Sequence, residues 1–224
     1  MPFTTKTISF LQQLRTNNNR DWFNDHKQDY EDVVRTPALE FIEQMAAPLA
    51  KISPQFEAIP KKVGGSLMRI YRDTRFGKDK TPYKTNIGIQ FRHRLGKDVH
   101  APGFYLHIEP GEVFVGVGIW RPDSATLLKI RTAITEKPKP YQQALAHKPF
   151  QHFSMAGDSL KRPPRGFDAE HPLVEELKRK DFIAVTELDE KVLFEKSLVN
   201  KIAKQFDSAT PLMKFLCQAI DVKF

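Results

Sequence analysis

Cysteine is nearly absent from this sequence, with Cys217 the only one among 224 residues. A single cysteine excludes an intrachain disulfide framework and is typical of a reducing compartment. Cys217 lies in the apolar run 212–217, and free cysteine is among the residue types most often buried. We therefore expect it to be a small core residue.

Long apolar segments are missing as well. No uncharged stretch approaches the roughly 18–20 residues that a membrane span needs. Residues 1–6 lead directly into an amphipathic pattern and do not resemble a secretory signal. We expect a cytoplasmic protein that has no membrane partner.

Familiar catalytic and metal-binding motifs are also missing. The Gly-Gly-Ser run 64–66 lacks the lysine of a P-loop, and no Gly-x-Ser-x-Gly elbow of a serine hydrolase is present. His93, His100 and His107 recur at intervals of seven, which places them on no common face of a strand or helix. With one cysteine, this spacing does not indicate a zinc site. We expect neither a bound metal nor a cofactor.

The composition is that of a folded protein, with 40% hydrophobic and 11% aromatic residues. Such a fraction disfavours disorder, because disordered chains lack the apolar surface that offsets the entropy of ordering. The length suits one large domain, and we find no repeat, low-complexity tract or linker. We expect a single domain covering residues 1–224. The formal net charge of +8 favours anionic partners, either small anions or polymers.

Hydrophobic periodicity predicts the fold class. A helical period occurs at both ends of the chain, over 5–16, 19–34 and 37–53, with a break and restart at Thr36-Pro37, and again from residue 124 to residue 220. The middle alternates with strand spacing over 87–91, 104–109 and 113–120, and Pro110-Gly111 joins the last two as a β-hairpin. Further short strands are expected at 66–71 and 182–185, and a long loop at 148–172. Helices, then strands, then helices indicate an α+β fold, a single domain with an antiparallel β-sheet flanked by N-terminal and C-terminal helices.

The most distinctive feature is the basic, aromatic-laced segment 69–84. Six positive and two negative side chains leave it an excess of four charges, half of the formal net charge of +8. Arginine offers planar forks for phosphate or carboxylate, turns at Gly77 and Thr81-Pro82 expose backbone N–H groups, and Tyr71, Phe76 and Tyr83 can stack on bases or sugars. The alternative is a solvated loop whose arginines pair with its aspartates. We predict an anion-binding site formed by Arg69, Tyr71, Arg72, Asp73, Arg75, Lys78, Lys80, Tyr83 and Lys84.

The pattern Arg-x-Tyr-Arg-Asp-Thr-Arg-Phe-x-Lys-Asp-Lys-x-Pro-Tyr-Lys over 69–84 resembles the signature of the bacterial and fungal family catalogued as domain of unknown function 2461. The resemblance continues at 10–23, 103–111, 118–122 and 165–178. It implies one domain over the whole chain and no established activity. Gly77 stands where this family more often has serine, so no hydroxyl contribution is expected at that position.

A second group of candidates lies on the predicted hairpin. Tyr105, His107 and Glu109 share one face of it, and Trp120 lies on the partner strand. If this face meets the basic segment, His107 is the natural proton carrier, because histidine titrates near neutral pH. The alternative is a half-exposed sheet histidine with a hydrogen-bond partner. We add Tyr105 and Trp120 to the predicted ligand-binding residues and take His107 as the candidate catalytic residue.

Three functions fit these residues. In the first, an enzyme or enzyme-like pocket binds a phosphorylated or carboxylated small ligand: the arginines clamp the anion, Lys80 or Lys84 neutralises charge, and His107 moves a proton. In the second, a non-catalytic nucleic-acid binder uses the same cations on successive phosphates. The third is a scaffold for an acidic protein partner. The embedded aspartates favour the pocket, whereas the basic runs 161–165 and 178–180 favour the polymer. We favour the pocket.

Overall fold

Six strands form one antiparallel sheet in the computed structural model, which describes residues 2–75, 77–96 and 100–224. The sheet has the order β1-β2-β3-β4-β6-β5. The strands are β1 (Phe56–Glu57), β2 (Ile87–His93), β3 (Gly103–Glu109), β4 (Glu112–Ile119), β5 (Ser154–Ala156) and β6 (Phe182–Glu187). The turn between β3 and β4 contains Gly111 at a φ of +83°, a conformation that glycine adopts without strain. The predicted antiparallel sheet and its hairpin are confirmed.

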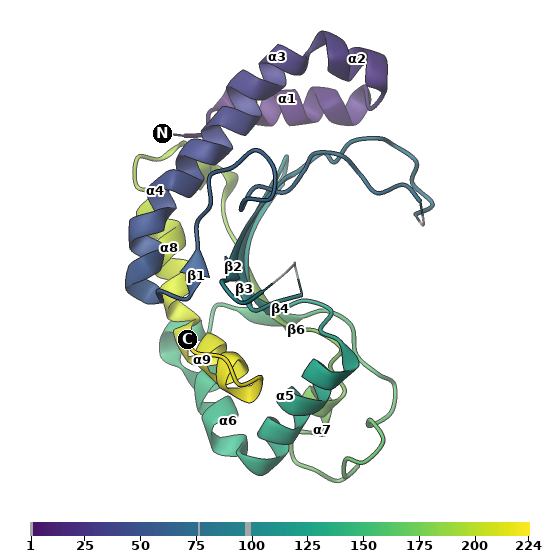
Figure 1. Cartoon of the computed structure of the whole chain (residues 1–224), viewed down its shortest axis with the longest axis vertical. Helices are drawn as coiled ribbons and strands as arrows, with labels where there is room; N and C mark the ends of the chain where they lie inside the picture. Colours follow the sequence, from purple (N-terminus) through teal and green to yellow (C-terminus); the bar gives the residue numbers. More distant parts are fainter. Residues whose placement is uncertain (1, 76, 97–99) are drawn as a thin grey trace.

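Alternation along each strand gives the sheet two different faces. Large apolar side chains on one face are buried, among them Ile89, Phe91, Phe104, Leu106 and Val115. Helices from both ends of the chain cover this face: α4 contacts β1 and β2, and α8 and α9 contact β4. The opposite face looks into the concave side of a C-shaped molecule (Figure 1).

The N-terminal helices are α1 (Thr5–Thr16), α2 (Arg20–Asp25), α3 (Lys27–Tyr30) and α4 (Thr36–Ile52). The predicted break before Pro37 is wrong. A π-helical turn, Glu31–Arg35, carries the chain from α3 into α4 without leaving helical geometry. Pro37 lies in the first turn of α4, directly after this π-helical turn.

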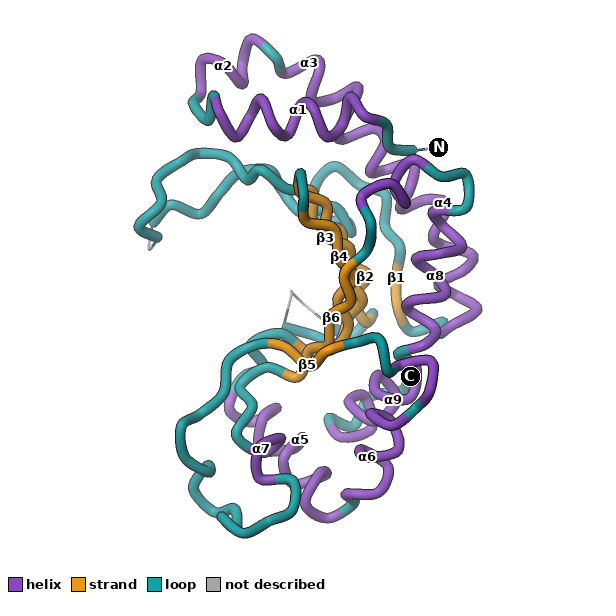
Figure 2. Tube along the Cα trace, turned by 180° about the vertical axis from the view of Figure 1, so that it is seen from behind, coloured by secondary structure: helices purple, strands orange, loops and turns teal. Residues whose placement is uncertain are grey.

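The C-terminal half contributes α5 (Ser124–Glu136), α6 (Pro138–Ala146), α7 (Val174–Leu177), α8 (Leu198–Ser208) and α9 (Thr210–Ala219). Short 3-10 turns, Lys148–Phe150 and Glu190–Phe194, precede β5 and α8. Helices α4 and α8 lie to the right of the sheet in Figure 2, on its convex side, whereas α5, α6, α7 and α9 lie below it. The chain therefore has the predicted α+β class, with an antiparallel sheet flanked by helices from both chain ends.

Several short elements differ from the prediction. The expected strand at 66–71 forms only isolated bridges, Leu67 with Ile89 and Tyr71 with Tyr83. The expected long loop at 148–172 contains β5, which pairs with β6 at the edge of the sheet.

The hydrophobic core is one cluster that joins distant parts of the sequence. It includes Phe3, Leu14, Phe91, Phe206 and Cys217, so the N-terminal helices, the sheet and the C-terminal helices share it. Cys217 is fully buried, as predicted. Among the described residues, no helix combines the length and the apolar character that crossing a membrane requires.

Candidate anion-binding cavity and histidine cluster

The basic segment 69–84, here called the basic hairpin, folds back on itself and projects from the sheet (Figure 1). Two backbone hydrogen bonds hold its arms together, from Arg72 N to the oxygen of Pro82 at 2.9 Å and from Lys84 N to that of Ile70 at 2.7 Å. Cations from two stretches of sequence are thereby brought side by side.

The two aspartates of the hairpin shape its turns. Asp73 accepts bonds from the backbone and guanidinium of Arg75, which lower the pKa of that carboxyl to about 2. Asp79 accepts from the N–H of Thr81 at 2.9 Å and from its hydroxyl at 2.8 Å, and these bonds lower the Asp79 pKa. Asp79 also pairs with Arg72 at 3.1 Å. The alternative prediction, a solvated loop whose arginines pair with its aspartates, therefore holds for Arg75. Its side chain is 75% exposed and pairs with Asp73.

Asn18 fastens the hairpin to the N-terminal helices. Its side-chain amide nitrogen donates to the backbone oxygen of Tyr83 at 2.9 Å, and its side-chain oxygen accepts from the backbone N–H of Tyr83 at 3.1 Å. The side chain thus makes the same pair of hydrogen bonds that a neighbouring strand would make. The Tyr83 ring stacks on Phe23, with centroids 4.1 Å apart. Next to it, Asn19 caps α2 by accepting from Trp22 N. The turn between α1 and α2 is thus fixed against the hairpin.

A cavity of about 610 Å³, here called the hairpin cavity, lies between that turn and the basic hairpin. Its lining residues are Asn18, Asn19, Arg20, Asn24, Tyr71, Arg72, Thr74, Lys80, Pro82 and Tyr83. Three of these carry a positive charge, and among the described lining residues none is acidic. The cavity is therefore electropositive and offers amide and hydroxyl groups beside its cations.

Arg72 is the best-placed cation of the cavity. One of its terminal nitrogens pairs with Asp79 and the other lies 3.4 Å from the Tyr83 oxygen. Its Nε is buried and has no hydrogen-bond partner among the described residues. A buried donor without a partner is uncommon in folded proteins, and Arg131 Nε shares this property. Nearby, burial lowers the pKa of Lys84, and the charges of Arg69 and Arg72 lower it further.

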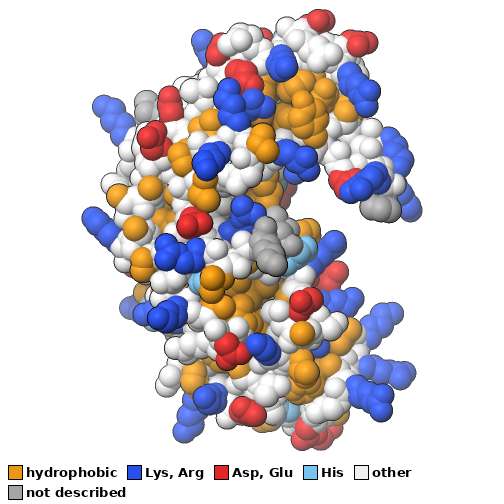
Figure 3. Space-filling model, viewed as in Figure 1, with side chains coloured by type: hydrophobic (Ala, Val, Ile, Leu, Met, Phe, Trp, Pro, Cys, Tyr) orange, Lys and Arg blue, Asp and Glu red, His pale blue; other side chains and the backbone are white. Residues whose placement is uncertain are grey.

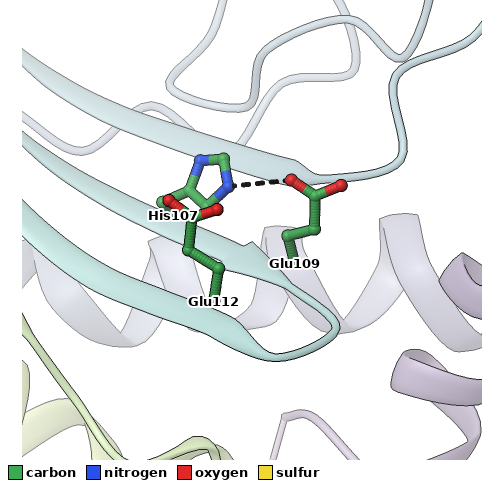
Figure 4. Close-up of side chains that lie close together, drawn as sticks. All are labelled: His107, Glu109 and Glu112. Carbon is green, nitrogen blue, oxygen red and sulfur yellow. Dashed lines mark hydrogen bonds and ion pairs between the residues drawn. The ribbon is translucent and has the colours of Figure 1, made fainter.

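The second group of side chains lies on the concave face of the sheet, at the end of β3 (Figure 4). The Tyr105 hydroxyl is 3.1 Å from Nδ1 of His107, and Asn86 Nδ2 is 3.4 Å from the same atom. Nε2 of His107 is 3.4 Å from Glu109 Oε2. The hydroxyl of Thr85 donates to the other oxygen of Glu109 at 2.6 Å. Both ring nitrogens of His107 therefore have partners.

Packing fixes this histidine further. Its ring stacks on Phe114, with centroids 4.6 Å apart, and its side chain is 14% exposed. Burial raises the pKa of Tyr105 to about 12, helped by the charges of Glu109 and Glu112, so its hydroxyl stays protonated. Thr85 and Asn86, which contact Glu109 and His107, directly follow Lys84 at the end of the basic hairpin.

The family model described as Conserved hypothetical protein (DUF2461) matches residues 6–215. The chain belongs to this family. No curated protein and no solved structure matches it.

In this DUF2461 protein, the predicted site residues fall into separate places. Those that line the hairpin cavity are Tyr71, Arg72, Lys80 and Tyr83. Lys80 also donates to the Thr74 oxygen at 2.7 Å. Arg69 and Lys84 are not among the lining residues, and neither are Asp73, Arg75 and Lys78. Phe76 lies outside the described residues.

Trp120 is far from the histidine cluster. Trp120 directly follows Ile119, the last residue of β4, whereas Phe114 lies near the start of that strand. Six residues at the rise of a strand place Trp120 about 20 Å from Phe114. Its ring stacks on His100, and the guanidinium of Arg121 lies 4.7 Å from its centre. Trp120 and Tyr105 therefore do not share a site.

Several site residues escaped the sequence reasoning. Asn18 reaches the cavity from the α1–α2 turn, and Arg20 and Asn24 reach it from α2. These residues are distant in sequence from the basic hairpin, and no local pattern indicates the contact. The sequence could have indicated that Glu112 lies beside Glu109. A two-residue turn at Pro110-Gly111 makes these two residues cross-strand partners.

Proposed function

We propose that this protein binds a small ligand bearing phosphate or carboxylate in the hairpin cavity. The observation that carries the proposal is the lining of the cavity, in which three cations occur with no acidic residue among those described. The guanidinium of Arg72 among these lining residues supports it, because a planar guanidinium fork matches the oxygens of a phosphate or carboxylate.

The cavity suits a ligand of moderate size. Its volume of about 610 Å³ lies within the range of roughly 300–1,000 Å³ common for small-molecule sites. Tyr71, whose side chain is exposed, offers aromatic surface beside the cations. A base, sugar or aromatic ring attached to the anion would find stacking surface there.

Asp79 competes with the ligand for Arg72. Its side chain is 52% exposed, so water screens the pair, and exposed ion pairs contribute little. A phosphate with a larger charge and more acceptor oxygens would displace or share this contact. His107 does not line the cavity, so the proposal is a binding function and assigns no reaction. A cytoplasmic location is part of the proposal and rests on the single buried cysteine.

A thermal-shift panel tests the proposal. Phosphate, pyrophosphate, nucleoside phosphates and di- and tricarboxylates are added to the wild type, to Arg72→Ala and to Arg75→Ala. Arg75 is the matched control, because it lies in the same hairpin and does not line the cavity. We expect at least one of these ligands to stabilise the wild type and Arg75→Ala, and its affinity to fall about tenfold or more in Arg72→Ala. The absence of any stabilisation by the panel, or equal shifts in both variants, would contradict the proposal.

Nucleic-acid binding is the second candidate. Lys and Arg side chains gather on the basic hairpin at the upper right and along the lower right edge, on the two arms of the C (Figure 3). The basic run 161–165 belongs to the loop of the lower arm. A polymer spanning both arms would use this surface, and its binding would depend steeply on salt.

A further inference from the structure

Three potential metal ligands converge at the β3–β4 turn. His107, Glu109 and Glu112 each present a donor atom, and these atoms all lie within 4.8 Å of one another (Figure 4). The arrangement follows from strand geometry. His107 and Glu109 are two residues apart on β3 and so share a face, and Glu112 of β4 is the register partner of Glu109.

The spacing suits one bound ion. Nitrogen and oxygen ligands lie about 2.0–2.2 Å from a divalent transition metal, so neighbouring donors around it are about 3.0–3.5 Å apart. The distance from His107 Nε2 to Glu109 Oε2 is 3.4 Å. A small rotation of the Glu112 side chain, which is exposed at the mouth of the turn, brings a third donor to the same point.

Residues outside the cluster orient these donors. The Tyr105 hydroxyl lies 3.1 Å and the Asn86 amide nitrogen 3.4 Å from His107 Nδ1, and these contacts hold the ring with Nε2 facing the Glu109 carboxylate. Thr85 donates to Oε1 of Glu109 at 2.6 Å and leaves Oε2 facing the histidine. Metal-binding histidines and carboxylates are usually held by such outer hydrogen bonds.

The two carboxylates of the cluster repel each other, and a bound cation would reduce this repulsion. Glu109 and Glu112 oppose each other directly across the two strands, and like charges in that position destabilise a sheet. Among the described residues, no Lys or Arg lies within the 4.0 Å salt-bridge distance of either carboxylate, and His107 alone pairs with Glu109. An ion between the two carboxylates would offset their repulsion.

We propose that His107, Glu109 and Glu112 bind one divalent first-row transition metal ion, of the class Mn²⁺, Fe²⁺ or Zn²⁺. One imidazole nitrogen with two carboxylate oxygens is a donor set between the all-oxygen sites of Mg²⁺ and the sulfur-rich sites of structural zinc. Three protein ligands leave coordination positions open on the concave side, where water or a ligand oxygen binds, as in catalytic metal sites.

Metal binding changes the role of His107. The ion takes the lone pair of Nε2, so the histidine holds the metal and does not carry a proton in that state. The proposal does not depend on the hairpin cavity, because no member of the cluster lines that cavity. Failure of either proposal therefore leaves the other standing.

Calorimetric titration of the full chain with Zn²⁺, Mn²⁺ and Mg²⁺ tests the site, alongside the visible absorption of bound Co²⁺. The variant is Glu112→Gln, which keeps shape and removes the charge. The matched control is Glu187→Gln, an exposed glutamate on the adjacent strand that pairs with Phe114 and lies outside the cluster. We expect one ion per chain in the wild type and the control, with Zn²⁺ or Mn²⁺ bound at least tenfold more tightly than Mg²⁺. In Glu112→Gln, affinity should fall at least tenfold, and Glu112→His should restore it for Zn²⁺.

A stability measurement in chelator separates loss of the site from loss of the fold. Without metal, Glu112→Gln should unfold at the wild-type denaturant concentration or above it, because the opposed charges are relieved. No stoichiometric binding to the wild type, or equal affinity in Glu112→Gln and Glu187→Gln, would overturn the proposal. Destabilisation of Glu112→Gln in chelator would contradict the charge argument on which it rests.

Discussion

Desolvation has a strong effect on the acidity of individual side chains in this fold. Burial raises the pKa of Cys217 and of Tyr105 to about 12 each, and it lowers the pKa of Lys84. Exposed Asp73 is governed by its neighbour instead, since hydrogen bonds from Arg75 lower its pKa to about 2. Cys217 and Tyr105 therefore stay protonated over the physiological range, whereas Asp73 in the turn of the basic hairpin stays ionised.

Cys217 gives a test of this account at the scale of one residue. An unfolded thiol loses its proton near its ordinary value of 9.0, whereas burial holds the folded thiol protonated up to about 12. Unfolding then releases a proton within that window, so stability falls as pH rises from 9 toward 12. Between pH 8 and about pH 10.5 the wild type should lose about 2 kcal/mol more unfolding free energy than Cys217→Ala. Denaturant unfolding at the two pH values measures the difference, and equal losses would show that the thiol is not buried as described.

At the scale of elements, sequence patterns predicted the strands and turns that depend on neighbouring residues. The β3–β4 hairpin follows from alternation and from the Pro110-Gly111 turn, and both lie within a short stretch of sequence. Strands β1 and β5, of 2 and 3 residues, are too short for a period and exist because β2 and β6 offer them partners. The docking of Asn18 on Tyr83 joins residues 65 apart, which no pattern in a single sequence reveals.

Asn18 therefore gives the test at the element scale. Asn18→Ala removes both hydrogen bonds to the Tyr83 backbone and leaves buried polar groups without partners. We expect a loss of about 1–3 kcal/mol in the free energy of unfolding, together with faster hydrogen exchange of the Tyr83 amide. Asn17→Ala is the control, because the Asn17 side chain makes only an exposed bond to the Gln13 oxygen within its own helix. Its effect should stay within about 0.5 kcal/mol, and equal effects of the two substitutions would contradict the docking role.

At the scale of the whole molecule, hydrophobic periodicity predicted the α+β class and composition the positive charge, but neither predicted the shape. The sequence places half of the formal net charge of +8 in one segment. Only the fold shows that this segment becomes one arm of a C and that its cations meet the α1–α2 turn around a cavity (Figure 1). Arg69 was predicted to clamp the anion and Lys80 to neutralise its charge, and of these two the path of the hairpin brings only Lys80 into the cavity lining.

The distinction between a small anion and a polymer is the central claim, and salt dependence tests it most directly. Labelled single-stranded DNA and RNA are titrated at several salt concentrations against the wild type and Arg72→Ala, in parallel with the best small ligand from the thermal-shift panel. Our account predicts weak polymer binding, together with small-ligand binding that Arg72→Ala abolishes or weakens about tenfold or more. Each phosphate contacted on a single strand contributes about −0.7 to the log–log salt slope, so four contacts would give about −3. Submicromolar polymer binding with a slope of about −3 or steeper that survives Arg72→Ala would contradict the account and identify a nucleic-acid-binding protein.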